Sequence, residues 1–266
     1  MKILNIGAAG EVGTGLRREL AGHFDFRYLD LRRDGFSDRD DFVQGSISDF
    51  DLLRRAMEGV DGVLHLAGCT TDADIDQQIE GNIKGAYNVF EAARLVGVKR
   101  VVFASSHHVV GYYPRNRRIG SEVLLRPDSR YGLTKAFGEQ VGALYADKYG
   151  LEVLCIRIGR ANERSEDRRR MSLWVSWRDL AQLVRIGFEH PELHYAVVYG
   201  VSGNDRTFFD NSAAFKLGYQ PQDNSEAHAE EVMAQPPEDP GLVGTHAIGG
   251  HFSNNEFVPP ISRIFK

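Results

Sequence analysis

Three glycines at three-residue intervals constrain the fold of this chain more than any other feature of its sequence. Gly7, Gly10 and Gly13 follow an apolar run at residues 3–6 and open a helical pattern that reaches about residue 23. A strand that passes through a glycine turn into a helix is typical of the first βα unit of a parallel α/β sheet. We therefore expect an α/β fold.

The same alternation of short apolar runs and helical patterns continues along the chain. Further strands are predicted at residues 26–30, 42–44, 63–67, 101–104, 153–158 and 196–199. Their mostly unbroken apolar character is typical of parallel strands that are covered on both faces. One long helix is predicted after residue 67, with a single apolar face made by Ile79, Ile83, Ala86, Phe90 and Ala93. The pattern predicts a Rossmann-type, doubly wound parallel sheet.

The domain organisation follows from where this alternation weakens. We expect residues 1–160 to form the Rossmann core. Residues 161–266 are rich in proline and glycine near their end and are predicted to form a small substrate-side lobe and C-terminal tail. Because 266 residues are few for two separate cores, both parts are expected to pack as one compact unit.

Composition excludes several classes of protein. The net charge is −5 and no long basic run is present, so nucleic acid is not an expected partner. No apolar stretch is long enough to span a bilayer, and the first residues enter a strand directly, which leaves no room for a signal peptide. Cys69 and Cys155 have neither metal-ligand nor CxxC spacing, so we expect no metal, no disulfide and a cytoplasmic location.

The glycine turn points to a dinucleotide. Its backbone can approach a pyrophosphate, whose negative charge is stabilised by the N-terminus of the following helix. Asp30 ends the second predicted strand, where a carboxylate accepts hydrogen bonds from a ribose 2′-hydroxyl. The same carboxylate repels a 2′-phosphate, which favours NAD over NADP, although Arg32 and Arg33 would weaken that preference. A strand-end turn is the alternative explanation of Asp30.

A second group of residues suggests proton transfer. Tyr131 and Lys135 lie one helical turn apart, so that a lysine ammonium can stabilise the tyrosine phenolate. Ser106 follows a strand at the edge of the sheet where ligands collect, and its hydroxyl can bond the substrate oxygen that Tyr131 deprotonates. A solvated surface pair is the alternative for Tyr131 and Lys135 taken alone.

The motifs GAAGEVG, HLAG, GNIKGAYNVFEAAR, FASS and YGLTK together resemble the short-chain dehydrogenase/reductase superfamily, in its branch related to nucleotide-sugar epimerases. The resemblance implies that Ser106, Tyr131 and Lys135 are catalytic and that Asn82 supports them by organising water. It implies an NAD site made by the residues that follow the strands, together with Tyr131 and Lys135. The residues of that site other than these two are Gly7, Gly10, Glu11, Val12, Gly13, Asp30, Leu31, Ser46, Ile47, Leu66, Ala67, Gly68 and Ile158.

A narrower resemblance covers nearly the whole chain. The segments FASSHHVVGYYPR, RPDSRYGLTKAFGE, LCIRIG, RRMSLWVSWRDL, VVYGVSGNDRTFFDN, LGYQPQDN and GGHF are similar to bacterial uronate dehydrogenases. That family oxidises C1 of galacturonate or glucuronate with NAD and yields the aldarolactone. The resemblance implies a small-molecule sugar acid as substrate and a homo-oligomer as the assembly. The substrate-binding residues that it suggests are Thr70, Ser106, His107, His108, Tyr131, Arg160, Arg169 and Phe252.

This chain departs from the uronate dehydrogenase pattern at several positions. His107 stands where the family usually has asparagine, Thr70 where it has serine, and Ile6 where it has threonine. Arg160 replaces a small residue and makes the loop 160–170 strongly basic. Two hypotheses follow: a solvated arginine-rich loop, or a pocket for a sugar phosphate or a second carboxylate.

Four functions are compatible with these observations. The first is oxidation of a hexuronate, with Tyr131 as the base and Arg169 holding the carboxylate. The alternatives with related chemistry are a 1-dehydrogenase for another sugar or sugar phosphate, and a nucleotide-sugar epimerase or dehydratase. A non-catalytic protein that senses NAD is the alternative from a different class.

Overall fold

The computed structural model describes residues 1–70 and 73–265. Its centre is a parallel sheet of seven strands in the order β3-β2-β1-β4-β5-β6-β9. The strands are β1 (Lys2–Ile6), β2 (Asp25–Asp30), β3 (Phe42–Gln44), β4 (Gly62–His65), β5 (Arg100–Ser106), β6 (Glu152–Ile158) and β9 (Tyr195–Gly200). The chain winds outward from β1 to β3 and then crosses back to β4. This confirms the doubly wound sheet, in which ligands bind where the strand order reverses, between β1 and β4.

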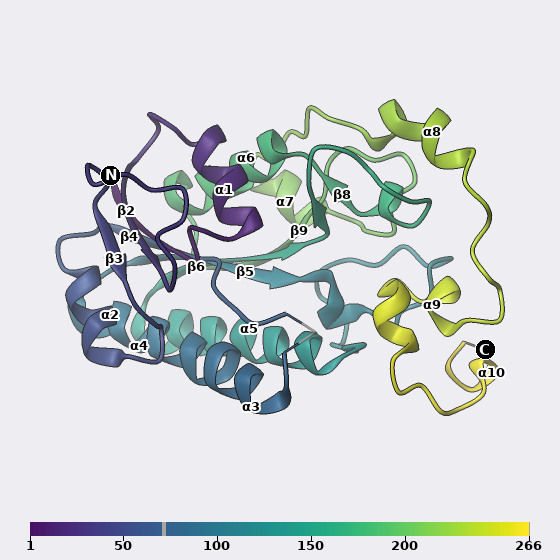
Figure 1. Cartoon of the computed structure of the whole chain (residues 1–266), viewed down its shortest axis with the longest axis horizontal. Helices are drawn as coiled ribbons and strands as arrows, with labels where there is room; N and C mark the ends of the chain where they lie inside the picture. Colours follow the sequence, from purple (N-terminus) through teal and green to yellow (C-terminus); the bar gives the residue numbers. More distant parts are fainter. Residues whose placement is uncertain (71–72, 266) are drawn as a thin grey trace.

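Helices cover both faces of this sheet (Figure 1). On one face lie α1 (Glu11–Glu19) and α6 (Trp177–Glu189), and on the other α2 (Phe50–Met57), α4 (Gly85–Val96) and α5 (Arg130–Tyr149). Consecutive strand residues point to opposite faces, so Val63 packs in the core under α2 and α4 while Leu64 packs under α1 and α6. Burial on both sides explains why the strands contain unbroken apolar runs.

The helix predicted after residue 67 differs from the expectation in its first half. It consists of α3 (Ile75–Gln78), a π-helical turn η1 (Ile79–Lys84) and α4. A π turn takes up one more residue than an α turn, so the apolar face predicted from regular spacing does not extend through it. Ile79 is consequently 48% exposed, and Asn82 is buried instead. The prediction of Ile79 as a core residue was wrong.

The second half of the chain extends the sheet and then covers its carboxyl edge. β9 pairs with β6, and a separate pair is formed by β7 (Arg160–Ala161) and β8 (Trp174–Val175). The other short helical segments are η2 (His107–Val110), η3 (Arg170–Ser172), α7 (Ser212–Lys216), η4 (Ser225–His228), α8 (Ala229–Met233), α9 (Val243–His246), η5 (Gly250–Asn254) and α10 (Ile261–Ile264).

The C-terminal segment with α9 and η5 lies beyond the carboxyl end of β5 (Figure 1). The division of the chain at residue 160 stays a prediction. β9 follows that position and belongs to the central sheet, and α6 follows it and packs on one face of that sheet. No helix within residues 1–70 and 73–265 is long and apolar enough to cross a membrane.

Candidate active site

The glycine turn connects β1 to α1 with almost no free space inside it. A Cβ atom on Gly13 would lie 2.5 Å from the carbonyl oxygen of Gly7, and Gly7 itself has a φ of +86°. The N-cap residue of α1 is Gly10, and no side chain caps this helix, so its first turn is open to an anion. The turn therefore has the form that a pyrophosphate group requires.

The other residues predicted to bind the cofactor all follow carboxyl ends of the central strands. Asp30 is the last residue of β2, and its carboxylate accepts hydrogen bonds from the backbone N–H groups of Ala9 (2.9 Å) and Arg32 (3.1 Å). It thus ties the glycine turn to the end of β2. The remaining positions lie after β2, β3 and β4 and at the end of β6, in the order Leu31, Ser46, Ile47, Leu66, Ala67, Gly68 and Ile158.

A cleft of about 420 Å³ begins at the first turn of α1 and runs to the C-terminal segment. It brings together all of the residues predicted to contact substrate, from five separate parts of the chain. These residues are Thr70, Ser106, His107, His108, Tyr131, Arg160, Arg169 and Phe252. Glu11, Val12, Leu66, Lys135 and Ile158 line the same cleft, so the predicted cofactor and substrate sites are continuous.

Tyr131 and Lys135 lie in the first turns of α5, and Ser106 ends β5 opposite them. The Lys135 ammonium lies 5.7 Å from the centre of the Tyr131 ring and donates a 2.9 Å hydrogen bond to the carbonyl of Ala104. Burial raises the pKa of Tyr131 to about 12, against an opposing hydrogen bond from Ser106. Burial also lowers the pKa of Lys135 to about 8. Both shifts arise because the ionised forms lose solvation in the cleft.

Asn82 fixes the segment after β4 against α5. Its amide oxygen accepts a 2.6 Å bond from the Cys69 N–H, and its amide nitrogen donates to the Cys69 carbonyl and to the Thr134 hydroxyl, each at 2.9 Å. The protein thus uses both amide hydrogens. Asn82 therefore bridges the segment after β4 and helix α5. Its role in organising water stays a prediction.

His107 and Arg169 form a pair at the far side of the cleft. The Nδ1 atom of His107 lies 3.1 Å from the carbonyl oxygen of Ile158, and its Nε2 lies 3.5 Å from Nη1 of Arg169. Burial lowers the pKa of His107 well below its usual value, so the ring is neutral and Nε2 can accept. Arg169 is 6% exposed and also donates to the carbonyl of Ile248 at 2.9 Å.

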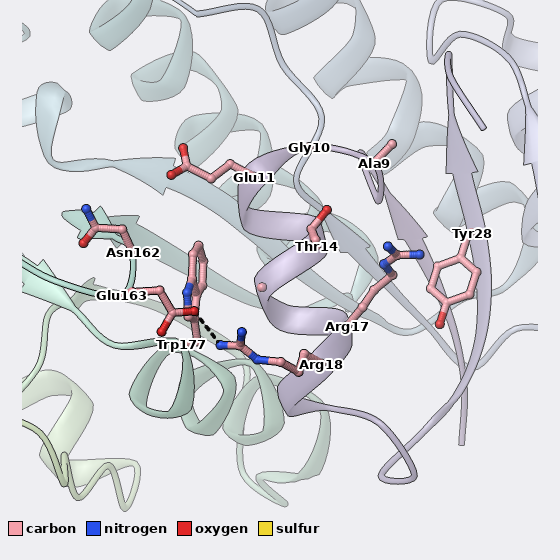
Figure 2. A pocket seen from close by; sticks show the side chains of 11 residues that line it. Ala9, Gly10, Glu11, Thr14, Arg17, Arg18, Tyr28, Asn162, Glu163 and Trp177 are labelled. Carbon is pink, nitrogen blue, oxygen red and sulfur yellow. Dashed lines mark hydrogen bonds and ion pairs between the residues drawn. The ribbon is translucent and has the colours of Figure 1, made fainter. Parts of the chain in front are cut away.

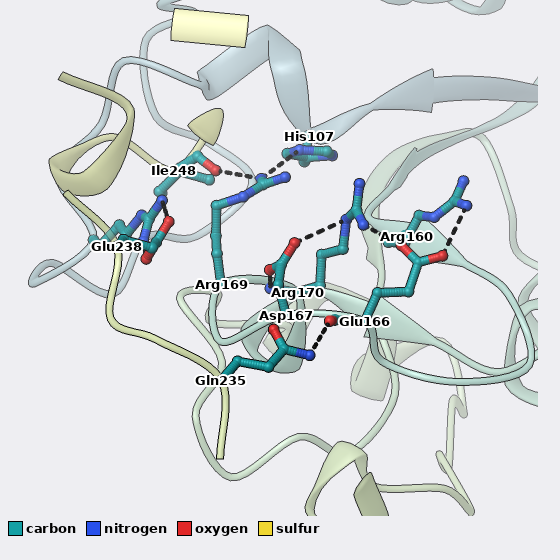
Figure 3. A network of polar contacts seen from close by, with 10 residues as sticks. His107, Arg160, Glu166, Asp167, Arg169, Arg170, Gln235, Glu238 and Ile248 are labelled. Carbon is teal, nitrogen blue, oxygen red and sulfur yellow. Dashed lines mark hydrogen bonds and ion pairs between the residues drawn. The ribbon is translucent and has the colours of Figure 1, made fainter. Parts of the chain in front are cut away.

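The guanidinium of Arg169 differs from the other arginines of its loop (Figure 3). Within the described residues it makes no ion pair, although it is nearly buried. The other arginines of the loop are exposed or half-buried, and three of them bind carboxylates. Arg160 pairs with Glu11 and Glu166, Arg164 with Glu231, and Arg170 with Glu166 and Asp167, while Arg168 donates to the carbonyls of Met233 and Gln235. Arg168 also lacks a carboxylate partner among the described residues, but it is only half-buried, so Arg169 is the buried arginine of this loop without one.

Sequence reasoning missed two buried carboxylates near the site. Asp128 lies 2.7 Å from Nδ1 of His108, with its side chain fully buried. Glu139 pairs with Arg157 at 2.8 Å and accepts the Ser105 hydroxyl at 2.6 Å, which anchors the end of β5 to α5. Asp128 precedes a helix N-cap, so its sequence context is that of an ordinary turn residue.

A second and larger cleft of about 750 Å³ follows the outer side of α1. Figure 2 shows Arg17 beside Tyr28 on one side of the helix, and Arg18, in an ion pair with Glu163, near Trp177 on the other. It adjoins the glycine turn at Ala9 and Gly10 but contains none of the predicted catalytic or substrate-binding residues. The residues predicted to contact substrate therefore all line the other cleft, which contains Tyr131.

Comparison with known proteins agrees with this geometry. The model of the NAD dependent epimerase/dehydratase family matches residues 3–176, which include the glycine turn, Tyr131 and Lys135. The chain belongs to the NAD dependent epimerase/dehydratase family. This confirms the family resemblance and the fold that it implied.

Individual members of the family match over nearly the full length of the chain. Uronate dehydrogenase from Pseudomonas syringae pv. tomato is 38% identical, with 95% of each chain covered. NAD-dependent glucose-6-phosphate dehydrogenase from Haloferax volcanii is 36% identical over 84% of this chain and 94% of its own. The crystal structure of a uronate dehydrogenase mutant from Agrobacterium tumefaciens, complexed with NAD, superposes with a TM-score of 0.91 at 37% identity, covering 97% of this chain and 98% of that one.

Proposed function

We propose that this protein is an NAD-dependent dehydrogenase that oxidises the C1 hydroxyl of a hexuronate, galacturonate or glucuronate, to the aldarolactone. Two kinds of support meet in this proposal: curated uronate dehydrogenases at 37–38% identity over nearly the whole chain, and the cleft that joins the glycine turn to Tyr131.

The observation that carries the choice of an acid sugar is the unpaired charge of Arg169. Burial lowers the pKa of Arg169 to about 10, which still leaves the guanidinium protonated at neutral pH. A buried cation without a carboxylate partner is costly, and a substrate carboxylate would restore the balance. Arg160, Arg164 and Arg170 have carboxylate partners, and Arg168, which has only carbonyl partners, does not line the cleft. The geometry therefore supports one anionic group on the substrate rather than two.

The residues at the end of the sheet fit NAD. The uncapped N-terminus of α1 after the glycine turn is open to phosphate, and the Asp30 carboxylate suits two ribose hydroxyls but repels a 2′-phosphate. NAD, when bound, supplies the acceptor for the hydride from C1. Glu11, Val12 and Leu66 would border it, with Lys135 facing the ribose side of the cleft.

Residues of the chain would then accept the proton of the C1 hydroxyl. Ser106 would orient the C1 hydroxyl of the ring-closed sugar. Tyr131 would take the proton of that hydroxyl as hydride leaves C1, so that C1 becomes a carbonyl carbon bonded to the ring oxygen, which is a lactone. The Lys135 ammonium near the phenol stabilises the phenolate. Arg169 and His107 hold the carboxylate end, which fixes which carbon faces the cofactor.

A screen of NAD reduction tests this proposal. The enzyme is mixed with NAD and, in separate reactions, with galacturonate, glucuronate, glucose, arabinose and glucose 6-phosphate, and absorbance of NADH is followed. We expect turnover with the uronates and much weaker turnover with neutral sugars. Turnover with glucose 6-phosphate alone would show that the substrate is a sugar phosphate and not a uronate. In a further reaction with a nucleotide sugar, conversion of the sugar without release of NADH would favour epimerisation.

Self-association and a cytoplasmic location are further parts of the proposal. Tyr87 and Leu95 on α4 and Leu144 and Tyr149 on α5 are large apolar side chains that are each more than two fifths exposed, on the same face of the sheet. Such a surface is suited to a second copy of the chain. Light scattering of the purified protein would test the oligomer, and a monomer at all concentrations would contradict it.

A further inference from the structure

Asp128 is a buried carboxylate that no lysine or arginine neutralises within the described residues. Its side chain is fully buried, and the one titratable side chain that bonds it there is His108, with Oδ2 at 2.7 Å from Nδ1. Oδ1 accepts a 2.8 Å hydrogen bond from the Ser129 hydroxyl. Burial of a carboxylate is costly, so the chain keeps this group at the expense of stability.

The protein makes room for this carboxylate. A Cβ atom on Gly249 would lie 1.6 Å from Oδ2, which means that any side chain there would displace it. Gly249 belongs to the C-terminal segment that borders the cleft, next to His251 and Phe252. Asp128 is therefore enclosed by a part of the chain that also covers the candidate active site.

The contact determines which ring nitrogen of His108 carries hydrogen. An ionised carboxylate only accepts hydrogen bonds, so Nδ1 must donate to it. In the neutral ring Nε2 is then an acceptor, and it makes no hydrogen bond within the described residues. The ring borders the cleft, edge-on to Phe252 at 4.4 Å and to Tyr131 at 6.0 Å between centroids.

The neighbouring histidine has a different environment. His107 donates from Nδ1 to a backbone carbonyl, and its Nε2 faces the guanidinium of Arg169. Its acceptor nitrogen is thus directed to a protein cation. His108, in contrast, lines the same cleft as Tyr131, and no described residue bonds its acceptor nitrogen.

We propose that Asp128 is a positioning residue that holds His108 with Nδ1 protonated, so that Nε2 accepts a hydrogen bond from a hydroxyl group of the bound sugar. The proposal rests on the proposed function for the identity of the ligand. It also links the two sides of the site. The Ser129 hydroxyl that bonds Asp128 caps α5 at the Gly132 N–H (3.1 Å), so the same carboxylate orients His108 and the first turn of the helix that carries Tyr131.

A double-mutant cycle tests whether Asp128 acts through His108. Asp128→Asn keeps the shape but removes the charge and can present an N–H to the ring. We expect it to lower kcat/KM for the best uronate by about 10- to 100-fold, the usual cost of losing such a supporting hydrogen bond. In a His108→Ala background the same substitution should change kcat/KM by less than about twofold, because there is no ring to orient. An equal loss in both backgrounds, or no loss in the native one, would overturn the proposal.

The matched control is Asp210→Asn. Asp210 also accepts the hydroxyl of a nearby serine, Ser212, but it is exposed and has no histidine partner. Its substitution should leave kcat/KM unchanged.

A spectroscopic measurement decides the same point without a substrate. Nitrogen-15 NMR of the histidine-labelled native protein should show the rings of both His107 and His108 with Nδ1 protonated and Nε2 bare, and the signals of the second should disappear in His108→Ala. A ring at this position with Nε2 protonated and Nδ1 bare would overturn the proposal, and this result does not depend on the folding of Asp128→Asn. Failure of the function appears differently: no uronate would reduce NAD, while the tautomer of His108 would still be measured.

Discussion

The cofactor side and the substrate side of the cleft are built in different ways. On the cofactor side, the binding groups follow directly on strands, and backbone groups make the contacts that hold them. The Asp30 carboxylate, for example, accepts a hydrogen bond from the backbone N–H of Ala9, 21 residues away. The substrate side is assembled from separated segments by side-chain contacts, as in the bond from Arg169 to Ile248, 79 residues apart. The comparison teaches that a parallel sheet fixes the first side by topology, whereas the second side depends on long-range packing.

Tyr131 lies where the two sides meet, and its loss should have the largest effect. Tyr131→Phe removes the proton acceptor and is expected to lower kcat by about 10²- to 10⁴-fold, the range of a positioned acid or base. NADH binding, measured by fluorescence, should persist. A Tyr131→Phe enzyme with native turnover would contradict the mechanism.

Substitution of Arg169 affects the substrate side alone. Arg169→Gln should lower kcat/KM for uronates by about 10- to 100-fold, since a hydrogen bond to a charged group contributes about 1.5–3 kcal/mol. Binding of NADH and the slow oxidation of neutral sugars should be nearly unchanged.

Arg164→Gln provides the comparison for Arg169→Gln. Arg164 pairs with Glu231 at an exposed position of the same loop, so its loss should have little effect on any substrate. Equal losses for uronates and neutral sugars in Arg169→Gln would show that Arg169 supports the C-terminal segment rather than a carboxylate.

This difference in construction also explains which features could be predicted from the sequence and which could not. The seven strands, the glycine turn and the last position of β2 at Asp30 depend on local periodicity and on residues near in sequence, and all three are confirmed. Asp128 was missed because its partner His108 lies 20 residues away across a loop and no local pattern marks the contact. Ile79 was misplaced because a π turn leaves no signature in apolar spacing.

A change confined to the cofactor side should have a smaller, selective effect. Gly13→Ala places a methyl group 2.5 Å from the Gly7 carbonyl, and a shift of the backbone turn costs about 1–3 kcal/mol. We expect the dissociation constant of NADH to rise about tenfold or more and the specificity among sugars to stay the same. Gly120→Ala, where the added methyl meets nothing within 4 Å, should change neither. An altered sugar preference in Gly13→Ala would show that the two sides are not independent.

The smallest expected effect concerns stability, and it arises at Lys135, between the two sides. Its ammonium has a pKa of about 8 in the folded protein, against the ordinary 10.5 that applies to the unfolded chain. Between these values the unfolded state binds more protons, so the free energy of unfolding should rise with pH, by at most about 1.4 kcal/mol per pH unit. Below pH 8 both states are protonated and the contribution of Lys135 is constant.

Lys135→Met should remove the rise of the free energy of unfolding with pH, while Lys148→Met, at an exposed position on the same helix, should retain it. Urea unfolding at pH 7.5, 8.5 and 9.5 measures the slopes, and equal slopes in native protein and Lys135→Met would mean that the lysine is not desolvated in the cleft.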